Sequence, residues 1–172
     1  MHPEEYLDLV NERDEVIGRK LRSEIYAEGL NNFRVINAFL VNSKGRFWIP
    51  RRTAHKAIFP LALDFSAAGH VESGDTYDHT FAKEVGEELN IDVSKVSWRK
   101  LGQLKPGELG ERPKQFMGVY EIQSDETPNY NPDDFIEHFW LAPQEVIDRI
   151  EAGDKTKGDL PVLLKHFYLH GN

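Results

Sequence analysis

The sequence contains no cysteine, which excludes disulfide bonds, thiolate nucleophiles and thiolate metal ligands. Long apolar runs are missing too: Ala38–Val41, among the longest, is far shorter than the roughly 20 residues that cross a bilayer. The N-terminal segment Met1–Glu5 is acidic and lacks the basic-then-apolar order of a secretory signal. We therefore expect a cytoplasmic protein that does not interact with membranes.

Positive charge is also in short supply. The chain has 21 Lys and Arg residues against 29 Asp and Glu, a formal net charge of −8, and no run of basic residues. Because duplex nucleic acids are bound through a basic face, we expect no DNA or RNA duplex as a partner. An acidic protein can still bind a polyanionic small molecule when divalent cations mediate the contact. The 172 residues, 40% of them hydrophobic, suffice for one domain with a buried core.

Segments rich in β-branched and aromatic residues predict the strands of this domain. Residues 33–42 form the strongest of them, and Ser43–Gly45 supplies a turn into a partner strand at 46–49. A small N-terminal hairpin is expected over residues 7–18. Further strands are expected near 96–104, 115–122 and 135–141.

A helix is predicted over residues 77–89, because an apolar residue recurs at every fourth position, at Tyr77, Phe81, Val85 and Leu89. A second helix is expected to follow Pro143 and to end at Gly153, and a third to run from about residue 160 to 169. Strands before, between and after helices indicate a mixed α/β or α+β domain with one central sheet.

The helix at 77–89 has a second, acidic face made by Glu84, Glu87 and Glu88. Residues spaced i, i+3 and i+4 project from one side of a helix, where like charges cost about 0.2–0.5 kcal/mol per pair. Three such glutamates by themselves are most simply interpreted as a solvated stripe. A divalent cation reverses the repulsion, and oxygen-only ligands suit Mg²⁺ or Mn²⁺.

The residues before this helix favour the cation site. Gly69–Thr76 is a glycine-punctuated loop that leads into the acidic helix, and the stretch Gly69–Ile91 resembles a Nudix box. That motif reads Gly, five residues, Glu, seven residues, Arg-Glu, an apolar residue, any residue, Glu-Glu, any residue, Gly and an apolar residue. The resemblance implies a single Nudix domain over residues 1–172, an α/β/α sandwich with a central mixed sheet that hydrolyses a phosphoanhydride.

Three positions depart from the motif: Asp75 replaces Glu, Lys83 replaces Arg and Asn90 replaces Gly. In the family the first two positions form a charge pair that braces the loop against the helix. The resemblance therefore assigns Gly69, Asp75 and Lys83 to structural support of the box. An Asp–Lys pair keeps the opposite charges but loses the bidentate fork of Arg. Asn90 can adopt the left-handed conformation that Gly usually provides.

The resemblance also implies that Glu84, Glu87 and Glu88 hold one or more Mg²⁺ (or Mn²⁺) ions that bridge the diphosphate of the substrate. Such a metal neutralises phosphate charge and lowers the pKa of the water that attacks phosphorus. Glu84 is the candidate for orienting or deprotonating this water. In the family this role alternates between the helix and a later loop, whose counterpart here is residues 131–140.

Within that later loop, Asp134 is our candidate for a fourth catalytic carboxylate, because it lies six residues before Trp140. Asp133 and Glu137 are alternatives for the same role. A purely structural interpretation is equally open, in which the aspartates cap backbone groups of a turn.

Basic residues at a predicted strand end are candidates for substrate binding. Arg51, Arg52 and Lys56 match residues that touch phosphate in many Nudix proteins, and the planar fork of Arg suits phosphate oxygens. Paired arginines at a strand end are also common surface residues. His70, beside the box glycine, is either an outer ligand or a structural residue.

Beyond the box, residues 8–18, Pro50–Arg52 and Lys56–Pro60 resemble the Nudix branch related to isopentenyl-diphosphate isomerase, and the similarity as a whole covers about residues 6–152. That isomerase relies on a cysteine immediately before the box glycine, where this chain has Ala68. A methyl group cannot transfer a proton. Isomerisation would therefore require another group, such as Ser66, His70 or Tyr77.

Hydrolysis is the favoured reaction, since metal, carboxylates and water are sufficient for it. The sequence is similar to bacterial members that hydrolyse nucleoside di- and triphosphates, with CDP and CTP as one choice. The expected substrate is a nucleotide or another nucleoside-diphosphate-linked small molecule. An isomerase-like enzyme and a non-catalytic nucleotide-sensing module are the alternatives, and a homodimer is compatible with the sequence.

Overall fold

The computed structural model describes residues 4–169, and its centre is a mixed sheet around the strand β3 (Arg34–Val41). The strands follow the order β6-β7-β3-β4-β8, and β5 pairs with β3 beside this path. Their bounds are β4 Phe47–Arg52, β5 Ala67–His70, β6 Ser97–Leu104, β7 Phe116–Gln123 and β8 Phe135–Leu141. Each strand predicted from the sequence is present, and residues 43–45 connect β3 to β4 as expected.

The strand β3 holds the sheet together because it pairs along both edges. On one side it runs parallel to β7 over its full length. On the other side it pairs antiparallel first with β5 and then, at Val41 and Phe47, with β4. From there β4 continues as the antiparallel partner of β8. The strands β5 and β4 therefore share one edge of β3, with β5 along its first half and β4 at its end.

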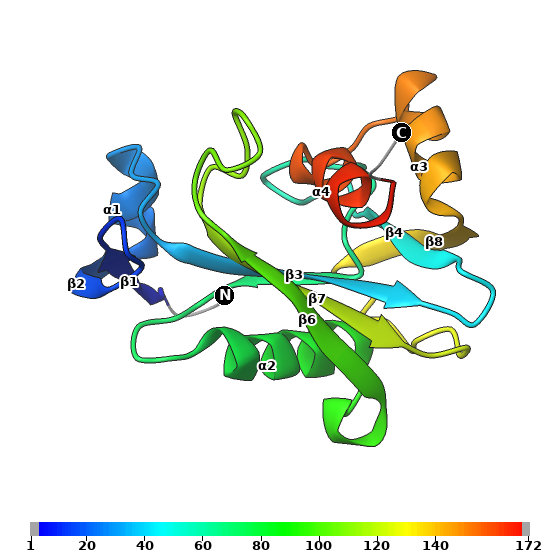
Figure 1. The fold of residues 1–172 in the computed structure, drawn as a ribbon, viewed down its shortest axis with the longest axis horizontal. Helices are drawn as coiled ribbons and strands as arrows, with labels where there is room; N and C mark the ends of the chain where they lie inside the picture. The colour runs from blue at the N-terminus through cyan, green and yellow to red at the C-terminus, as the bar shows by residue number, and fades with distance from the viewer. Residues whose placement is uncertain (1–3, 170–172) are drawn as a thin grey trace.

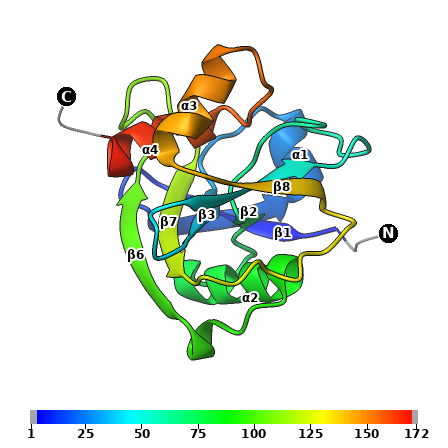
Figure 2. The same ribbon diagram turned by 90° about the vertical axis from the view of Figure 1, so that its right-hand side faces the viewer.

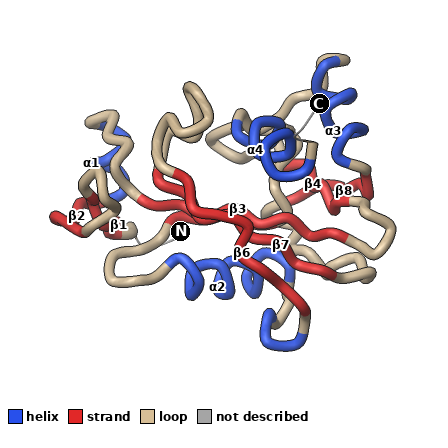
Figure 3. The backbone as a smooth tube through the Cα atoms, in the orientation of Figure 1, coloured by secondary structure: helices blue, strands red, loops and turns tan. Residues whose placement is uncertain are grey.

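Helices cover both faces of this sheet (Figure 1). The helix α2 (Tyr77–Leu89) lies on one face, and α3 (Pro143–Glu151) and α4 (Asp159–Tyr168) lie on the other, as Figure 3 also shows. Side chains of a strand point alternately to the two faces. Accordingly, Ile36, Ala38 and Leu40 pack with α2, whereas Phe39 packs with α3 and α4. The predicted α/β/α sandwich is confirmed.

One strand and one α-helix were not expected from the sequence. Residues 67–70, of which 69 and 70 had been assigned to a loop, form β5, and a six-residue helix α1 spans Arg22–Ala27. The segment Ala-Ala-Gly-His has no β-branched residue, so its pairing with β3 rather than its composition makes it a strand. The helix α1 is too short for an apolar period to be recognised. In the described part of the chain, no helix has both the length and the apolarity to cross a membrane.

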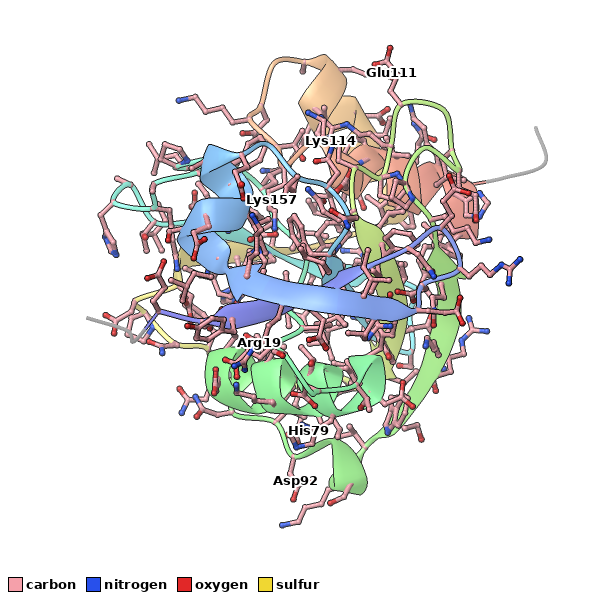
Figure 4. The ribbon with its side chains drawn as sticks, turned by 90° about the vertical axis from the view of Figure 1, so that its left-hand side faces the viewer. Arg19, His79, Asp92, Glu111, Lys114 and Lys157 are labelled. Atoms are coloured by element: carbon pink, nitrogen blue, oxygen red, sulfur yellow. The ribbon has the colours of Figure 1, made fainter. Side chains whose placement is uncertain are left out.

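The N-terminal hairpin forms a separate sheet from β1 (Tyr6–Val10) and β2 (Val16–Leu21), which lies across the main domain in Figure 4. Asp14, in the left-handed conformation at the hairpin turn, attaches it. Its carboxylate accepts hydrogen bonds from Arg34 Nε (2.7 Å), Tyr77 Oη (2.7 Å) and Gln103 Nε2 (3.0 Å). Those three donors belong to β3, α2 and β6, so one aspartate joins the hairpin to three elements.

We expect Asp14→Asn to lower the free energy of unfolding by about 2 kcal/mol, since it leaves the half-buried Arg34 charge without its carboxylate. Asn keeps the shape and tolerates the left-handed backbone, so the change isolates the charge. Urea denaturation measures the effect. The control is Asp125→Asn, at an exposed position bonded to Ser43, for which we expect a loss below about 1 kcal/mol. Equal losses for the two variants would contradict the central role of Asp14.

Candidate active site

The acidic face of α2 lies against the strand β5. The backbone N–H of Ala68 donates a hydrogen bond of 3.0 Å to Glu88 Oε1. A Cβ atom at Gly69 would overlap the carboxyl group of Glu84, with Oε1 only 2.7 Å away. Gly69 is therefore required for the close approach of strand and helix, and its predicted structural role has a steric explanation. Glu87, the third residue of the face, is exposed.

Burial raises the pKa of two of these three carboxyl groups. It raises the pKa of Glu84 to about 7, with a further contribution from the charge of Glu87. Burial also raises the pKa of Glu88 well above its usual value, against the opposing effect of the hydrogen bond from the Ala68 N–H. Glu88 keeps some contact with solvent, but its carboxyl group lies deep among protein atoms. Within residues 4–169, none of the three glutamates forms an ion pair with Lys or Arg.

Further carboxylates surround this pair. The charge of Asp134 raises the pKa of both Glu84 and Glu88, while Glu5 acts on Glu84 and Asp64 on Glu88. Sequence reasoning identified Asp134 but missed Glu5 and Asp64, which lie outside the box and belong to no motif. Glu84 and Glu88 thus lie among further carboxylates, an environment that favours a divalent cation.

The chemistry of these groups fits Mg²⁺ or Mn²⁺, because the available ligands are carboxylate oxygens. A cation would also remove the mutual repulsion that raises the pKa of Glu84. Among the described residues, no three Asp, Glu or His side chains already converge on one point that a metal ion could occupy. Binding at Glu84, Glu87 and Glu88 therefore requires these side chains to turn toward a common centre.

The box loop is braced differently from the expected Asp75–Lys83 pair, which is wrong. Lys83 Nζ lies 3.2 Å from Glu72 Oε1. Asp75 Oδ1 instead accepts a hydrogen bond from Thr76 N (2.8 Å) and lies 2.7 Å from His79 Nδ1. Asp75 lies two residues before the start of α2, and its short side chain reaches the first helical turn at His79. Lys83 lies two turns further on and reaches the loop at Glu72.

The hairpin supplies a second brace to the same loop. The buried carboxylate of Asp8 accepts hydrogen bonds from Ser73 Oγ (2.7 Å) and Gly74 N (3.1 Å). The backbone N–H of Ser73 also donates to Tyr6 O (2.7 Å). The loop between β5 and α2 is therefore held from one side by Lys83 and from the other by β1.

The predicted phosphate-binding cations are each engaged by a carboxylate. Arg51 pairs with Glu137 and with Asp154 (2.8 Å). Arg52 Nη1 lies 2.8 Å from Asp64 Oδ2, and Lys56 Nζ lies 2.9 Å from Asp134 Oδ1. The structure thus brings Arg52 and Lys56, but not Arg51, to carboxylates that act on the box glutamates. Sequence reasoning missed Lys157, labelled in Figure 4, which lies 3.4 Å from Asp64 Oδ1.

The three candidates for the fourth carboxylate differ in their surroundings. Asp134 is half-buried, and its charge acts on both buried glutamates of the box. Glu137 is the ion-pair partner of Arg51, and Asp133 is exposed. These positions favour Asp134.

His70 lies in an aromatic cluster rather than among the acids. Its ring stacks on Phe33 with centroids 5.8 Å apart, and its Nε2 lies 2.6 Å from Tyr26 Oη. Burial lowers the pKa of His70 to about 3, so the ring is neutral near pH 7. Of the two interpretations of His70, the structural one fits this environment.

Comparison with known proteins places this arrangement in a family. The profile of the NUDIX domain matches residues 31–163. An uncharacterized Nudix hydrolase of Nostoc sp. is 53% identical over 95% of this chain and 96% of its own length. The crystal structure of DR0079 from Deinococcus radiodurans, 47% identical, gives a TM-score of 0.89 over 95% of this chain and 99% of that one.

A more distant relative is the isopentenyl-diphosphate Delta-isomerase of Kocuria rhizophila, which is 23% identical over 84% of this chain and 81% of its own length. The similarity to both hydrolases and isomerases agrees with the branch predicted from the sequence. The close relatives are described as hydrolases. This chain belongs to the Nudix family and is a Nudix hydrolase.

Proposed function

We propose that the enzyme is a Mg²⁺-dependent nucleotide pyrophosphohydrolase that cleaves a nucleoside di- or triphosphate such as CDP or CTP and releases the nucleoside monophosphate. The observation that carries the proposal is the pair of buried carboxyl groups, Glu84 and Glu88, held against β5 without a cationic side chain between them. A buried acidic pair of this kind is best stabilised by a divalent cation, and a diphosphate is the substrate class that such a cation binds.

Each residue has a role that follows from its position. Glu84, Glu87 and Glu88 would hold Mg²⁺ or Mn²⁺, which supplies Lewis-acid activation of water and neutralises phosphate charge. Glu84, whose carboxyl group lies against Gly69, would also orient or deprotonate the attacking water. Asp134 is the fourth carboxylate, and it supports the orientation of the attacking water.

Substrate phosphates are expected to contact Lys56 and Arg52, and Arg51 is the third candidate for this role. Each of these cations is bonded to a carboxylate, so phosphate oxygens would have to compete for their N–H donors. The planar guanidinium of Arg52 has several donors and can bind phosphate while it keeps its contact with Asp64.

The isomerase alternative lacks an available acid in this structure. Ser66 Oγ is fully buried and donates to Trp48 O (2.7 Å), and the Tyr77 hydroxyl donates to Asp14. His70 is neutral and bonded to Tyr26. None of the three replaces a thiol beside Gly69. A non-catalytic nucleotide sensor is disfavoured because all three box glutamates are retained.

We further propose that the chain acts as a single domain over residues 1–172 in the cytoplasm. Its expected partner is a small nucleotide or nucleoside-diphosphate derivative, with neither duplex nucleic acid nor membrane involved, and it can form a homodimer. The net charge of −8 and the lack of a run of Lys and Arg in the sequence support the exclusion of nucleic acid.

The reaction itself can be tested by its products. With Mg²⁺, we expect CDP to yield CMP and phosphate and CTP to yield CMP and pyrophosphate, whereas isopentenyl diphosphate should give no allylic isomer. Chromatography of the nucleotides and of the isoprenoid diphosphates measures both. Catalytic formation of the allylic isomer with intact nucleotides would refute the hydrolase proposal. Ala68→Cys is the matched control, because a thiol alone should not create isomerase activity.

We expect Glu88→Gln to lower kcat by at least about 10²-fold, because the charge that holds the cation is lost. Gln keeps an oxygen acceptor for the Ala68 N–H, so the fold should be retained. The assay is nucleotide hydrolysis at saturating Mg²⁺. Glu151→Gln, at an exposed position of α3, is the control and should retain full turnover. Wild-type turnover of the Glu88 variant would show that the acidic face is not the metal site.

Magnesium affinity should depend on pH in a defined direction. Below pH 7 Glu84 is protonated and cannot bind a cation, and above it the carboxylate is free. We therefore expect the Kd for Mg²⁺ to be about tenfold lower at pH 8 than at pH 6 in calorimetric titrations. Glu84→Gln should bind Mg²⁺ weakly at both values. Equal affinities of the wild type at the two pH values would contradict the raised pKa of Glu84.

A further inference from the structure

The residue that ends the catalytic helix departs from the family motif. Asn90 takes the left-handed conformation, with φ 54°, and its N–H donates to Gly86 O (3.1 Å), so it closes α2 as Gly normally would. Unlike Gly, it has a side chain, and its Nδ2 donates a hydrogen bond to Asn129 O. This bond joins the end of α2 to the loop between β7 and β8, which runs along α2 in Figure 2.

The same loop has a second attachment to the helix. The backbone N–H of Asn131 donates to Glu88 O (2.9 Å), one of the carbonyls that a helix leaves without an internal partner at its C-terminal end. Glu88 is consequently fixed at both ends, since its carboxyl group accepts from Ala68 N and its carbonyl from Asn131 N.

These anchors lie three to five residues before Asp134, and a hydrogen-bonded turn connects them. Asp134 N donates to Asn131 O (3.0 Å), and Asp133 N donates to Asn131 Oδ1 (3.0 Å). Such hydrogen bonds restrict the conformation of the turn, so a displacement of Asn131 is expected to displace Asp134 as well. The carboxylate of Asp134 also forms an ion pair with Lys56, whose Nζ lies 2.9 Å away.

We propose that Asn90 is a positioning residue, which fixes the segment 129–134 on the end of α2 and thereby sets Asp134 relative to Glu84 and Glu88. The inference rests on the proposed function, in which Asp134 is the fourth carboxylate. The box glutamates and Asp134 come from segments about 45 residues apart, and the Asn90–Asn129 bond adds a direct constraint between them. A glycine at position 90 could end the helix but could not supply this constraint.

The variant Asn90→Gly tests the proposal, because Gly adopts the same left-handed backbone and loses only the side-chain bond. Amide hydrogen exchange at Asn131 should become about fivefold faster or more, as expected for the loss of one hydrogen bond. With CDP or CTP, kcat should fall about tenfold while the Kd for Mg²⁺ stays unchanged. Asn129→Ala keeps the accepting carbonyl and removes only an exposed side chain, so exchange at Asn131 should remain at the wild-type rate.

A double-mutant cycle with Asp134→Ala separates positioning from general support of the fold. If Asn90 acts through Asp134, then Asn90→Gly should have no further effect on kcat in the Asp134→Ala background. An undiminished tenfold loss in that background, or unchanged exchange at Asn131 in Asn90→Gly, would overturn the inference. If the wild type hydrolyses no nucleotide, the proposed function fails, and exchange at Asn131 still decides whether Asn90 holds the loop.

Discussion

The close contact between β5 and α2 is the constraint on which the site depends. Gly69 lets the strand approach until the carboxyl group of Glu84 occupies the space of a side chain, and the Ala68 N–H points at Glu88. Two carboxyl groups of like charge are thereby largely removed from solvent, which raises their pKa values. This contact disfavours the ionised form of both glutamates when no cation is bound, and it therefore favours the binding of a divalent cation.

The rest of the fold can be understood as support for this contact. The strand β5 is held in place by β3, which is itself fixed by β7 on its other edge. The loop that leads from β5 into α2 is held by a hydrogen bond to Asp8 of the hairpin and by an ion pair with Lys83 of the helix. The end of α2 is held by the loop before β8. Three separate segments of the chain therefore determine where one helix lies.

The basic side chains near the acidic face are our candidates for contacts with a polyanionic substrate. Arg52, Lys56 and Lys157 are kept in position by Asp64 and Asp134, with which phosphate oxygens would have to compete, in a chain whose net charge is negative. Ion pairs of this type fix the direction of a long side chain and reduce the entropy lost on binding. Phosphate selectivity would then depend on geometry and metal rather than on an excess of positive charge.

The amino-acid sequence alone predicted the helix 77–89, its acidic face and the positions of most strands along the chain, because these depend on residue periodicity and on motif spacing along a short stretch. It could not determine that Ala67–His70 forms a strand, that Lys83 pairs with Glu72, or that Glu5 and Asp64 lie near the box. The pairing of β5 and the surroundings of the box depend on which segments pack against one another. Burial and pairing energies arise only when these segments come together, so the sequence did not show which further carboxylates and cations surround the predicted box glutamates.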